Sequence, residues 1–148
     1  MSENRKEVVV RGDGEGLHHE VFVGSHRLSA DEPPHLGGSD RGPNPYDLLL
    51  ASLGSCTAMT LTMYAQRKDI PLRGVTTRLR HSRIHADDCA ACETEKGKLD
   101  SIELSIELDG PLNEEQRSTL LEIAHKCPVH RTLTSEKVIT INAGDGPG

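Results

Sequence analysis

The chain has 148 residues, four cysteines and a formal net charge of −6. The length is that of one domain, and the acidic balance excludes nucleic acid as a partner, because phosphate binding needs a basic face. The sequence has one Phe, two Tyr and no Trp, so the core is built from smaller apolar side chains and we expect a partner subunit to complete it. We expect a single domain over residues 1–148, with a mobile tail at 143–148.

The sequence predicts a soluble, cytoplasmic protein with no membrane contact. We expect no apolar run to reach the roughly 20 residues of a membrane span, and the first residues, MSENRKEVVVRGDG, contain no apolar signal-peptide region. Four cysteines in a reducing compartment favour catalysis, metal binding or inert thiols over structural disulfides. We expect no cofactor.

Short strands are predicted in the first third of the chain. Glu7–Arg11 is rich in β-branched residues, and His19–Val23 and Arg27–Ser29 flank a two-residue turn at Gly24. A turn-rich loop follows at residues 31–43. It is long for a compact domain, which is typical of functional loops.

A long helix is predicted from Pro45 to about Arg67. Asn44 can serve as its N-cap, Pro45 fits the first helical position, and Asp47 follows three residues after the cap. Apolar residues spread round most of the helix, which is typical of a buried, central one. Gly54 weakens the helix by about 1 kcal/mol relative to Ala, and a closely approaching neighbouring backbone would explain this residue.

The second half is predicted to contain strands and a second helix. Val75–Ile84 has a strand-like pattern, and Leu99–Leu108 alternates apolar and polar residues, as a half-buried strand does. A helix is predicted to begin after Asn113, with Gln116 at the capping-box position. Val138–Ile141 is predicted as the last strand.

Cys127 lies at a predicted break between helices. Pro128 disfavours a helical conformation at the residue before it and can itself open a short helix through His130–Ser135. As the N-cap of that helix, Cys127 would meet unpaired backbone N–H groups that favour a thiolate, and His130 and Arg131 could add positive charge. The alternative is a buried structural thiol beside a helix break.

Cys56 lies in the middle of the long predicted helix, so a cation from another segment would have to activate it. The candidates are Arg11, Arg41 and Arg131, with Asp47 placed to orient Arg41. The alternative is packing, because a single helical cysteine is usually a core residue and behaves as a small hydrophobe. If Cys56 and Cys127 can meet, they form a redox pair.

A second group of candidate ligands consists of His81, His85, Cys89 and Cys92. These four could complete a closed zinc site, although the usual two-knuckle zinc pattern is absent. The C-x-x-C spacing also suits a dithiol, and a plain polar loop is the third alternative. On a strand, His81 and His85 would point to the same side.

The segments GGSDRGPNPYDLLLASLGSCTAMTL and LLEIAHKCPVHRTL, with H-x-R-x-H between them, resemble the OsmC-like family of osmotically inducible and organic hydroperoxide resistance proteins. The resemblance extends over about residues 5–142. The stretch HSRIHADDCAACE is similar to a less characterised branch described only as predicted redox proteins. The resemblance implies an α+β fold with two central helices packed on antiparallel sheets. It also implies an intertwined homodimer with active sites at the subunit interface.

The resemblance further implies a reaction. A thiolate matching Cys56 attacks an organic hydroperoxide and becomes a sulfenic acid, a thiol matching Cys127 resolves it as a disulfide, and a dithiol reductant restores both. The alternative is a non-catalytic dimer that binds a ligand or metal. Hydroperoxide resistance members carry a Glu directly after N-P, paired with an Arg of the N-terminal strands. Here Tyr46 takes that position, and the activating Arg stays unassigned.

Overall fold

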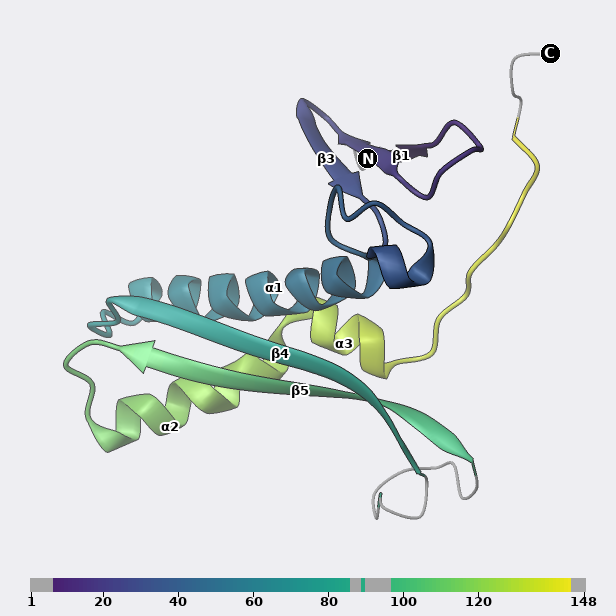
Figure 1. Ribbon diagram of the computed structural model, residues 1–148. Helices are drawn as coiled ribbons and strands as arrows, with labels where there is room; N and C mark the ends of the chain where they lie inside the picture. Colours follow the sequence, from purple (N-terminus) through teal and green to yellow (C-terminus); the bar gives the residue numbers. More distant parts are fainter. Residues whose placement is uncertain (1–6, 86–88, 90–96, 145–148) are drawn as a thin grey trace. The chain divides into compact units, whose positions relative to one another are not determined.

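The computed structural model describes residues 7–85, 89 and 97–144 (Figure 1). These residues form an α+β arrangement of helices and two sheets, as expected. They divide into two compact units. The first unit comprises Met1–Ser52 and Arg80–Ile102, and the second comprises Leu53–Leu79 and Glu103–Gly148.

The first unit contains an antiparallel sheet with the order β1-β2-β3. Its strands are β1 (Val8–Arg11), β2 (His19–Val23) and β3 (His26–Ala30), so the three predicted strands are confirmed. Gly24 turns the chain between β2 and β3 with φ +59°, a conformation that favours glycine. All four residues of β1 are exposed at the sheet edge.

The loop after β3 is organised around a buried carboxylate. Asp31 is only 2% exposed and accepts backbone N–H groups from Glu32 at 2.8 Å, Ser39 at 3.3 Å and Arg41 at 3.1 Å. The loop also contains the short 3-10 helix η1 (Pro34–Leu36). One buried side chain therefore satisfies backbone groups from both ends of the long predicted loop.

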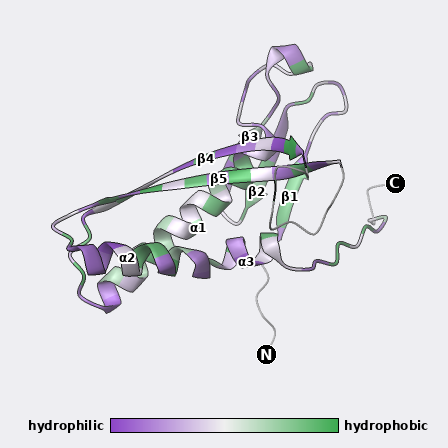
Figure 2. Ribbon diagram, turned by 90° about the horizontal axis from the view of Figure 1, so that it is seen from below, coloured by the Kyte–Doolittle hydropathy of each residue, from purple (hydrophilic) through white to green (hydrophobic). Residues whose placement is uncertain are grey.

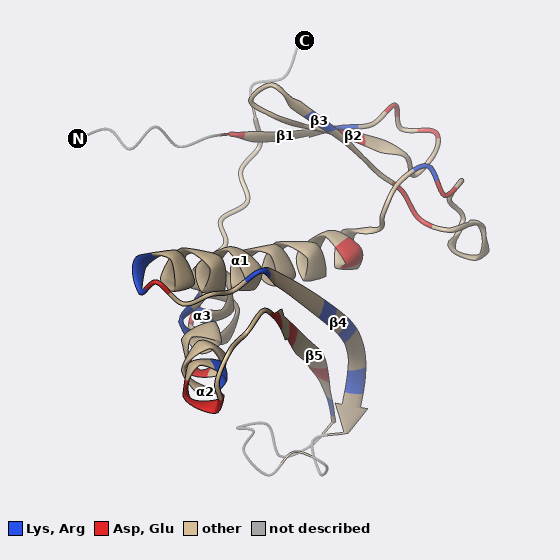
Figure 3. Cartoon of the chain, turned by 90° about the vertical axis from the view of Figure 1, so that its left-hand side faces the viewer, with Lys and Arg blue, Asp and Glu red and all other residues tan. Residues whose placement is uncertain are grey.

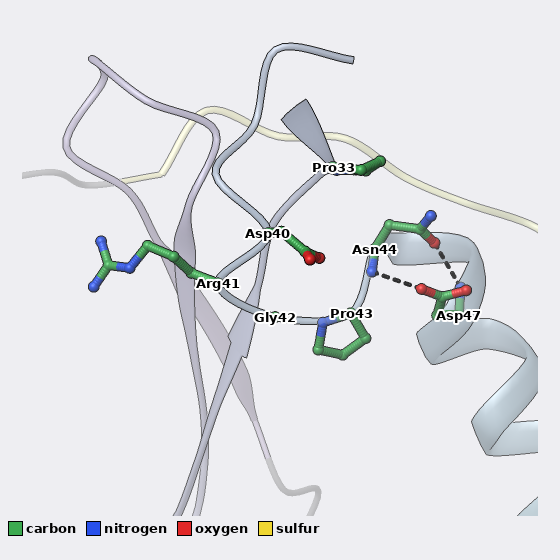
Figure 4. Close-up of a pocket in the computed structure, with 7 residues that line it drawn as sticks. All are labelled: Pro33, Asp40, Arg41, Gly42, Pro43, Asn44 and Asp47. Carbon is green, nitrogen blue, oxygen red and sulfur yellow. Dashed lines mark hydrogen bonds between the residues drawn. The ribbon is translucent and has the colours of Figure 1, made fainter. Parts of the chain in front are cut away.

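Helix α1 (Pro45–Arg67) has the predicted bounds. Asn44 Oδ1 accepts the backbone N–H of Asp47 at 2.8 Å, and Asp47 Oδ2 accepts the backbone N–H of Asn44 at 3.0 Å (Figure 4). This reciprocal arrangement satisfies two N–H groups that a helix start leaves unpaired.

The expectation that α1 is buried on all sides is wrong for the single chain. Met59 is 62% and Met63 is 64% exposed, because the described residues cover only one side of this part of the helix. The buried residues of α1 are Leu53, Gly54, Thr57, Leu61 and Ala65.

The expectation that no apolar run reaches the length of a membrane span is also wrong. Helix α1 is long and apolar enough to cross a membrane by length and composition alone, since an 18-residue window has a mean hydropathy of 1.4. Helices in the core of water-soluble proteins pass the same test.

Two long strands, β4 (Gly74–His85) and β5 (Lys98–Asp109), form the second sheet and confirm the predicted strands. Figure 3 shows basic residues along β4 and mainly acidic residues along β5. Arg78 pairs with Glu107 at 3.4 Å. The pair is exposed, so it contributes little to stability.

The second unit continues with α2 (Glu114–Ile123), the 3-10 helix η3 (Ala124–Lys126) and α3 (Pro128–Thr134). The predicted capping box of α2 is confirmed, because Asn113 and Gln116 exchange hydrogen bonds of 2.8 and 3.0 Å. Hydrophobic residues occur on both α1 and α2 (Figure 2). The buried core of this unit joins α1 to α2 and η3 through Leu61, Ala65, Leu120 and Ala124.

Gly54 of α1 lies against side chains of β4. A Cβ at this position would lie 2.6 Å from Leu79 Cδ1 and 2.9 Å from Thr77 Oγ1, and the Thr77 hydroxyl donates to the Gly54 carbonyl at 3.3 Å. The predicted close approach is therefore found, but the neighbours are side chains and not a backbone.

The predicted strand at Val138–Ile141 is wrong. These residues form no strand, and Val138, Ile139 and Ile141 are almost fully exposed. No strand among the described residues pairs with this segment, so its backbone lacks the partners that a strand needs. Of the predicted tail, residues 145–148 lie outside the described residues.

Candidate active site

Cys56 and Cys127, the two sulfurs singled out in the sequence, lie together in the second unit. Both are free thiols, and they lie close enough for each to shift the pKa of the other. Cys56 is partly exposed on α1, whereas Cys127 is 0% exposed. The pair therefore has one sulfur that a solute can reach and one that is enclosed.

The local sequence explains how Cys127 is held. Its backbone N–H donates to Ala124 O at 3.4 Å, and its carbonyl accepts the N–H of Arg131 at 3.1 Å. Cys127 has extended backbone angles (φ −57°, ψ 127°) and precedes Pro128 at the start of α3. Cys127 is thus the N-cap residue of a short helix, as the sequence predicts.

The surroundings of Cys127 favour its thiolate. Burial acts to raise the pKa of Cys127, but the Cys56 thiol, the His130 backbone N–H and the Thr57 hydroxyl outweigh burial, so this pKa is lowered. The backbone N–H groups of Val129 and His130 at the start of α3 lower the pKa of Cys127 through their electrostatic field. The Cys127 sulfur accepts no capping hydrogen bond from this helix.

The pKa of Cys56 moves the other way. Burial and the neighbouring Cys127 raise the pKa of Cys56, and the backbone N–H of Val129 and the hydroxyl of Thr60 only partly oppose them. Cys127 consequently ionises before Cys56. This order agrees with the helix-start argument for Cys127 made from the sequence.

Thr60 is a site residue that the sequence pattern does not mark. Its hydroxyl acts on Cys56, which precedes it by four residues on the same helix. That spacing places the two side chains one above the other and is the signal that could have identified Thr60.

The arginine candidates are divided between the units. Arg131 lies in the second unit and is exposed on α3. Arg11 and Arg41 both line a cavity of about 400 Å³ in the first unit. The expectation that Asp47 orients Arg41 is wrong, because the Asp47 carboxylate accepts the helix-capping N–H and Arg41 points away from it (Figure 4).

A cavity of about 410 Å³ lies in the second unit beside neighbours of the thiol pair, although neither Cys56 nor Cys127 lines it. Thr60, which lowers the pKa of Cys56, and Pro128, which follows Cys127, both line it. The cavity is lined by Thr60, Met63, Tyr64, Arg67, Ile123, Lys126 and Pro128. Its lining is mainly apolar but includes two cationic side chains. The cavity drawn in Figure 4 belongs to the first unit.

The second candidate cluster is not assembled within the described residues. His81 hydrogen-bonds Asp100 at 2.9 Å, and Cys89 is disulfide-bonded. Cys92 lies outside the described residues. Over residues 7–85, 89 and 97–144, no three His, Cys, Asp or Glu side chains group as metal ligands.

The family model described as OsmC-like protein matches residues 37–142, so the chain belongs to the OsmC-like family. No curated protein sequence matches it significantly. Among solved structures, the chain resembles the organic hydroperoxide resistance protein OsmC of Legionella pneumophila, at 24% identity and a TM-score of 0.64, covering 90% of this chain and 92% of that one.

Two further structures are similar. The OsmC-like protein of Mycoplasma pneumoniae has 20% identity and a TM-score of 0.68, covering 90% of this chain and 89% of that one. The organic hydroperoxide resistance protein OhrB of Bacillus subtilis has 20% identity and a TM-score of 0.59, covering 88% and 90%. These similarities establish the shared fold.

Proposed function

We propose that this chain is a thiol-dependent redox protein that reduces organic hydroperoxides, with Cys56 as the attacking sulfur and Cys127 as the resolving sulfur. The contact between an accessible and an enclosed free thiol is the observation that carries this proposal. Membership of the OsmC-like family supports the substrate class, because similar structures include organic hydroperoxide resistance proteins.

The accessible sulfur attacks first, although the enclosed one has the lower pKa. In the monoanionic pair, Cys56 keeps its proton beside the Cys127 thiolate, because the pKa of Cys56 is raised and that of Cys127 is lowered. As Cys56 attacks the terminal peroxide oxygen, the O–O bond breaks and the Cys56 proton passes to Cys127. Cys127 then gives this proton to the departing alkoxide. The products are a Cys56 sulfenic acid, an alcohol and a Cys127 thiolate.

The second step joins the two sulfurs. The Cys127 thiolate attacks the Cys56 sulfenic sulfur, forms the S–S bond and expels hydroxide. The hydroperoxide has then been reduced by two electrons and the dithiol oxidised to a disulfide. An external dithiol reductant, through thiol–disulfide exchange, restores both thiols.

The cavity beside the thiols suits the organic part of the substrate. Met63, Tyr64 and Ile123 offer apolar contact surface, which favours burial of an alkyl or aryl group. Arg67 and Lys126 also line the cavity and would attract an anionic group on that substrate. A hydroperoxide with an alkyl or aryl body and a negative charge remote from its peroxide group fits both the apolar lining and the two cations.

The proposed active form is a cytoplasmic homodimer. The exposed Met59 and Met63 on one side of α1 favour a second copy as the cover for that side, and the OsmC-like family membership supports it. The family match runs through both compact units, so we propose that they act as one domain. The alternative, a non-catalytic binding dimer, differs in leaving the two thiols unreacted.

Hydroperoxide consumption with a dithiol reductant tests the proposal. We expect the wild-type protein to turn over repeatedly and Cys56→Ser to have no activity above the protein-free rate. Without the reductant, Cys127→Ser should consume about one equivalent and accumulate a sulfenic acid that peptide mass mapping detects. Cys89→Ser is the matched control and should retain turnover. Equal rates for wild type and Cys56→Ser would refute the proposal.

A further inference from the structure

Two arginines border one cavity in the first unit. The cavity has a volume of about 400 Å³, which lies within the range of small-ligand sites. Within the residues that the structure describes, neither Arg11 nor Arg41 forms a salt bridge, so both guanidinium groups keep their donors for a ligand. The residues that line the cavity are Arg11, Gly12, Asp13, His18, Glu20 and Arg41.

Each arginine extends from a backbone that the fold holds in place. Arg11 ends β1 and is paired with Glu20 of β2 in the register of the sheet. The backbone N–H of Arg41 donates to the buried Asp31 carboxylate at 3.1 Å. The Arg41 side chain points away from the Asp47 carboxylate (Figure 4). The two guanidinium groups therefore reach the same cavity from two fixed segments, and both residues are exposed to a solute.

The two carboxylates of the lining are already occupied by other groups. Asp13 Oδ1 accepts two backbone N–H groups, at 2.9 and 3.3 Å. Glu20 forms an ion pair with Arg27, and the hydrogen bond from Arg27 is the main cause that lowers the pKa of Glu20. The charge of Arg11 has a weaker effect on Glu20. The carboxylates of the cavity therefore do not saturate its cationic donors.

His18 adds a further donor to the lining. Its Nε2 is hydrogen-bonded to Ser29 Oγ at 3.2 Å, which holds the imidazole in place. The ring then has an N–H at Nδ1, both in the neutral tautomer that accepts from the Ser29 hydroxyl and in the protonated form. Two guanidinium groups and one imidazole of the cavity can thus donate hydrogen bonds to an anion.

We propose that this cavity binds a phosphate group, with Arg11 and Arg41 as the principal donors. A guanidinium presents a planar fork of N–H groups that matches a pair of oxygens. One carboxylate has two oxygens and satisfies one fork, whereas a phosphate dianion has enough oxygens for both arginines. The described lining contains no apolar side chain, so the source is inorganic phosphate or a small, polar phosphate monoester. The chain's net charge of −6 acts from a distance and is screened by salt.

The site is independent of the proposed hydroperoxide chemistry. All of its lining residues belong to the first unit, whereas Cys56 and Cys127 belong to the second. Phosphate binding therefore requires neither thiol, and Cys56→Ser should bind phosphate as the wild-type protein does. A protein that binds phosphate without consuming hydroperoxide would refute the proposed function alone, and the reverse result would refute the phosphate site alone.

An NMR titration at constant ionic strength tests the site. Inorganic phosphate and glycerol 3-phosphate are the two probes, and chloride is the reference anion. The Nε–H resonances of Arg11 and Arg41 should shift to saturation with phosphate but not with chloride. The probe that binds more tightly identifies the source of the phosphate group, and equal affinities mean that the phosphate group alone is recognised. Arg11→Gln and Arg41→Gln should each weaken binding about tenfold, because a hydrogen bond to a charged group is lost.

Arg80→Gln is the matched control. Arg80 is an exposed arginine of the first unit that does not line the cavity, so this variant loses the same charge and should keep the wild-type affinity. An equal loss of affinity in Arg80→Gln would show general charge attraction and overturn the proposal. Wild-type affinity in Arg11→Gln and Arg41→Gln would also overturn it, and so would the absence of a saturable shift with either probe.

Discussion

Tyr46 stacks on His81, with ring centroids 4.5 Å apart and ring planes inclined by 15°. His81 in turn hydrogen-bonds Asp100 at 2.9 Å, so the first turn of α1 is joined to β4 and β5 within the first unit. The resemblance to hydroperoxide resistance proteins implies a Glu at the position of Tyr46. In this chain the position instead provides an aromatic contact.

We predict that Tyr46→Ala lowers the free energy of unfolding by about 0.5–1 kcal/mol, the lower part of the range for aromatic pairs, because Tyr46 is exposed on one side. Denaturant unfolding of purified protein measures the change. Tyr46→Phe keeps the ring and should behave as wild type. An unaltered midpoint in Tyr46→Ala would show that the stack contributes nothing to stability.

Met59→Glu should dissociate the proposed homodimer. A charge in the centre of an apolar interface is buried without a partner and costs several kcal/mol, whereas the same residue on a monomer stays in water. Sedimentation velocity at micromolar concentrations should show a dimer for wild type and a monomer for the variant. Ser118→Glu, at an exposed position on α2, is the control and should remain dimeric. A wild-type sedimentation coefficient in Met59→Glu contradicts the proposed use of this side.

Lys126→Glu should change substrate preference more than overall activity. The reversal places a negative charge at the cavity beside the thiols, so kcat/KM for an anionic apolar hydroperoxide should fall about tenfold relative to that for a neutral one, equivalent to about 1.4 kcal/mol. Steady-state assays with both substrates measure the ratio. Lys98→Glu makes the same charge change on β5 and should leave the ratio of the two kcat/KM values unaltered. An unaltered ratio in Lys126→Glu would show that Lys126 takes no part in substrate selection.

Protonation of Asp31 should lower the free energy of unfolding in acid. Burial acts to raise the pKa of Asp31, but backbone N–H groups of Glu32, Arg41 and Ser39 outweigh it and hold the pKa below 3.8. Because the pKa of Asp31 is lower in the folded than in the unfolded protein, its carboxylate stabilises the fold fully at pH values above the unfolded pKa. This stabilisation is lost as the pH falls through the folded pKa. Urea unfolding at neutral pH and below pH 3.8 measures this loss.

Asp31→Asn provides the matching comparison. It should be less stable than wild type at neutral pH, since its amide replaces a charged acceptor of N–H groups. It should also lose less stability on acidification than wild type does. Equal acid sensitivity in the two proteins would exclude Asp31 as a source of the pH dependence.

Local signals in the sequence were sufficient for most elements and for part of the site. Asn44, Pro45 and Asp47 define the start of α1 because each acts through its own backbone or its nearest neighbours. Pro128 likewise separates η3 from α3 and leaves Cys127 as the N-cap. These features depend on a few adjacent residues, so a single sequence contains them.

Features that depend on distant partners were predicted less well. The β-branched pattern of Val138–Ile141 favours a strand, but a strand also needs a neighbouring strand to hydrogen-bond, and its own sequence cannot supply one. Met59 and Met63 are apolar as in a buried helix, yet their burial depends on what covers them. The proximity of Cys56 and Cys127 is equally non-local: their segments suggest a thiol pair, and only the family resemblance implies that the two sulfurs meet.

The enclosure of Cys127 also bears on survival in excess oxidant. A sulfenic acid at Cys56 can be irreversibly converted to a sulfinic acid by a second hydroperoxide molecule, unless a thiol captures it first. Cys127 already contacts that sulfur and is itself inaccessible to dissolved oxidant. In the proposed reaction, the same packing that hides one thiol would therefore protect the other from permanent overoxidation, because capture requires no diffusion of a separate molecule.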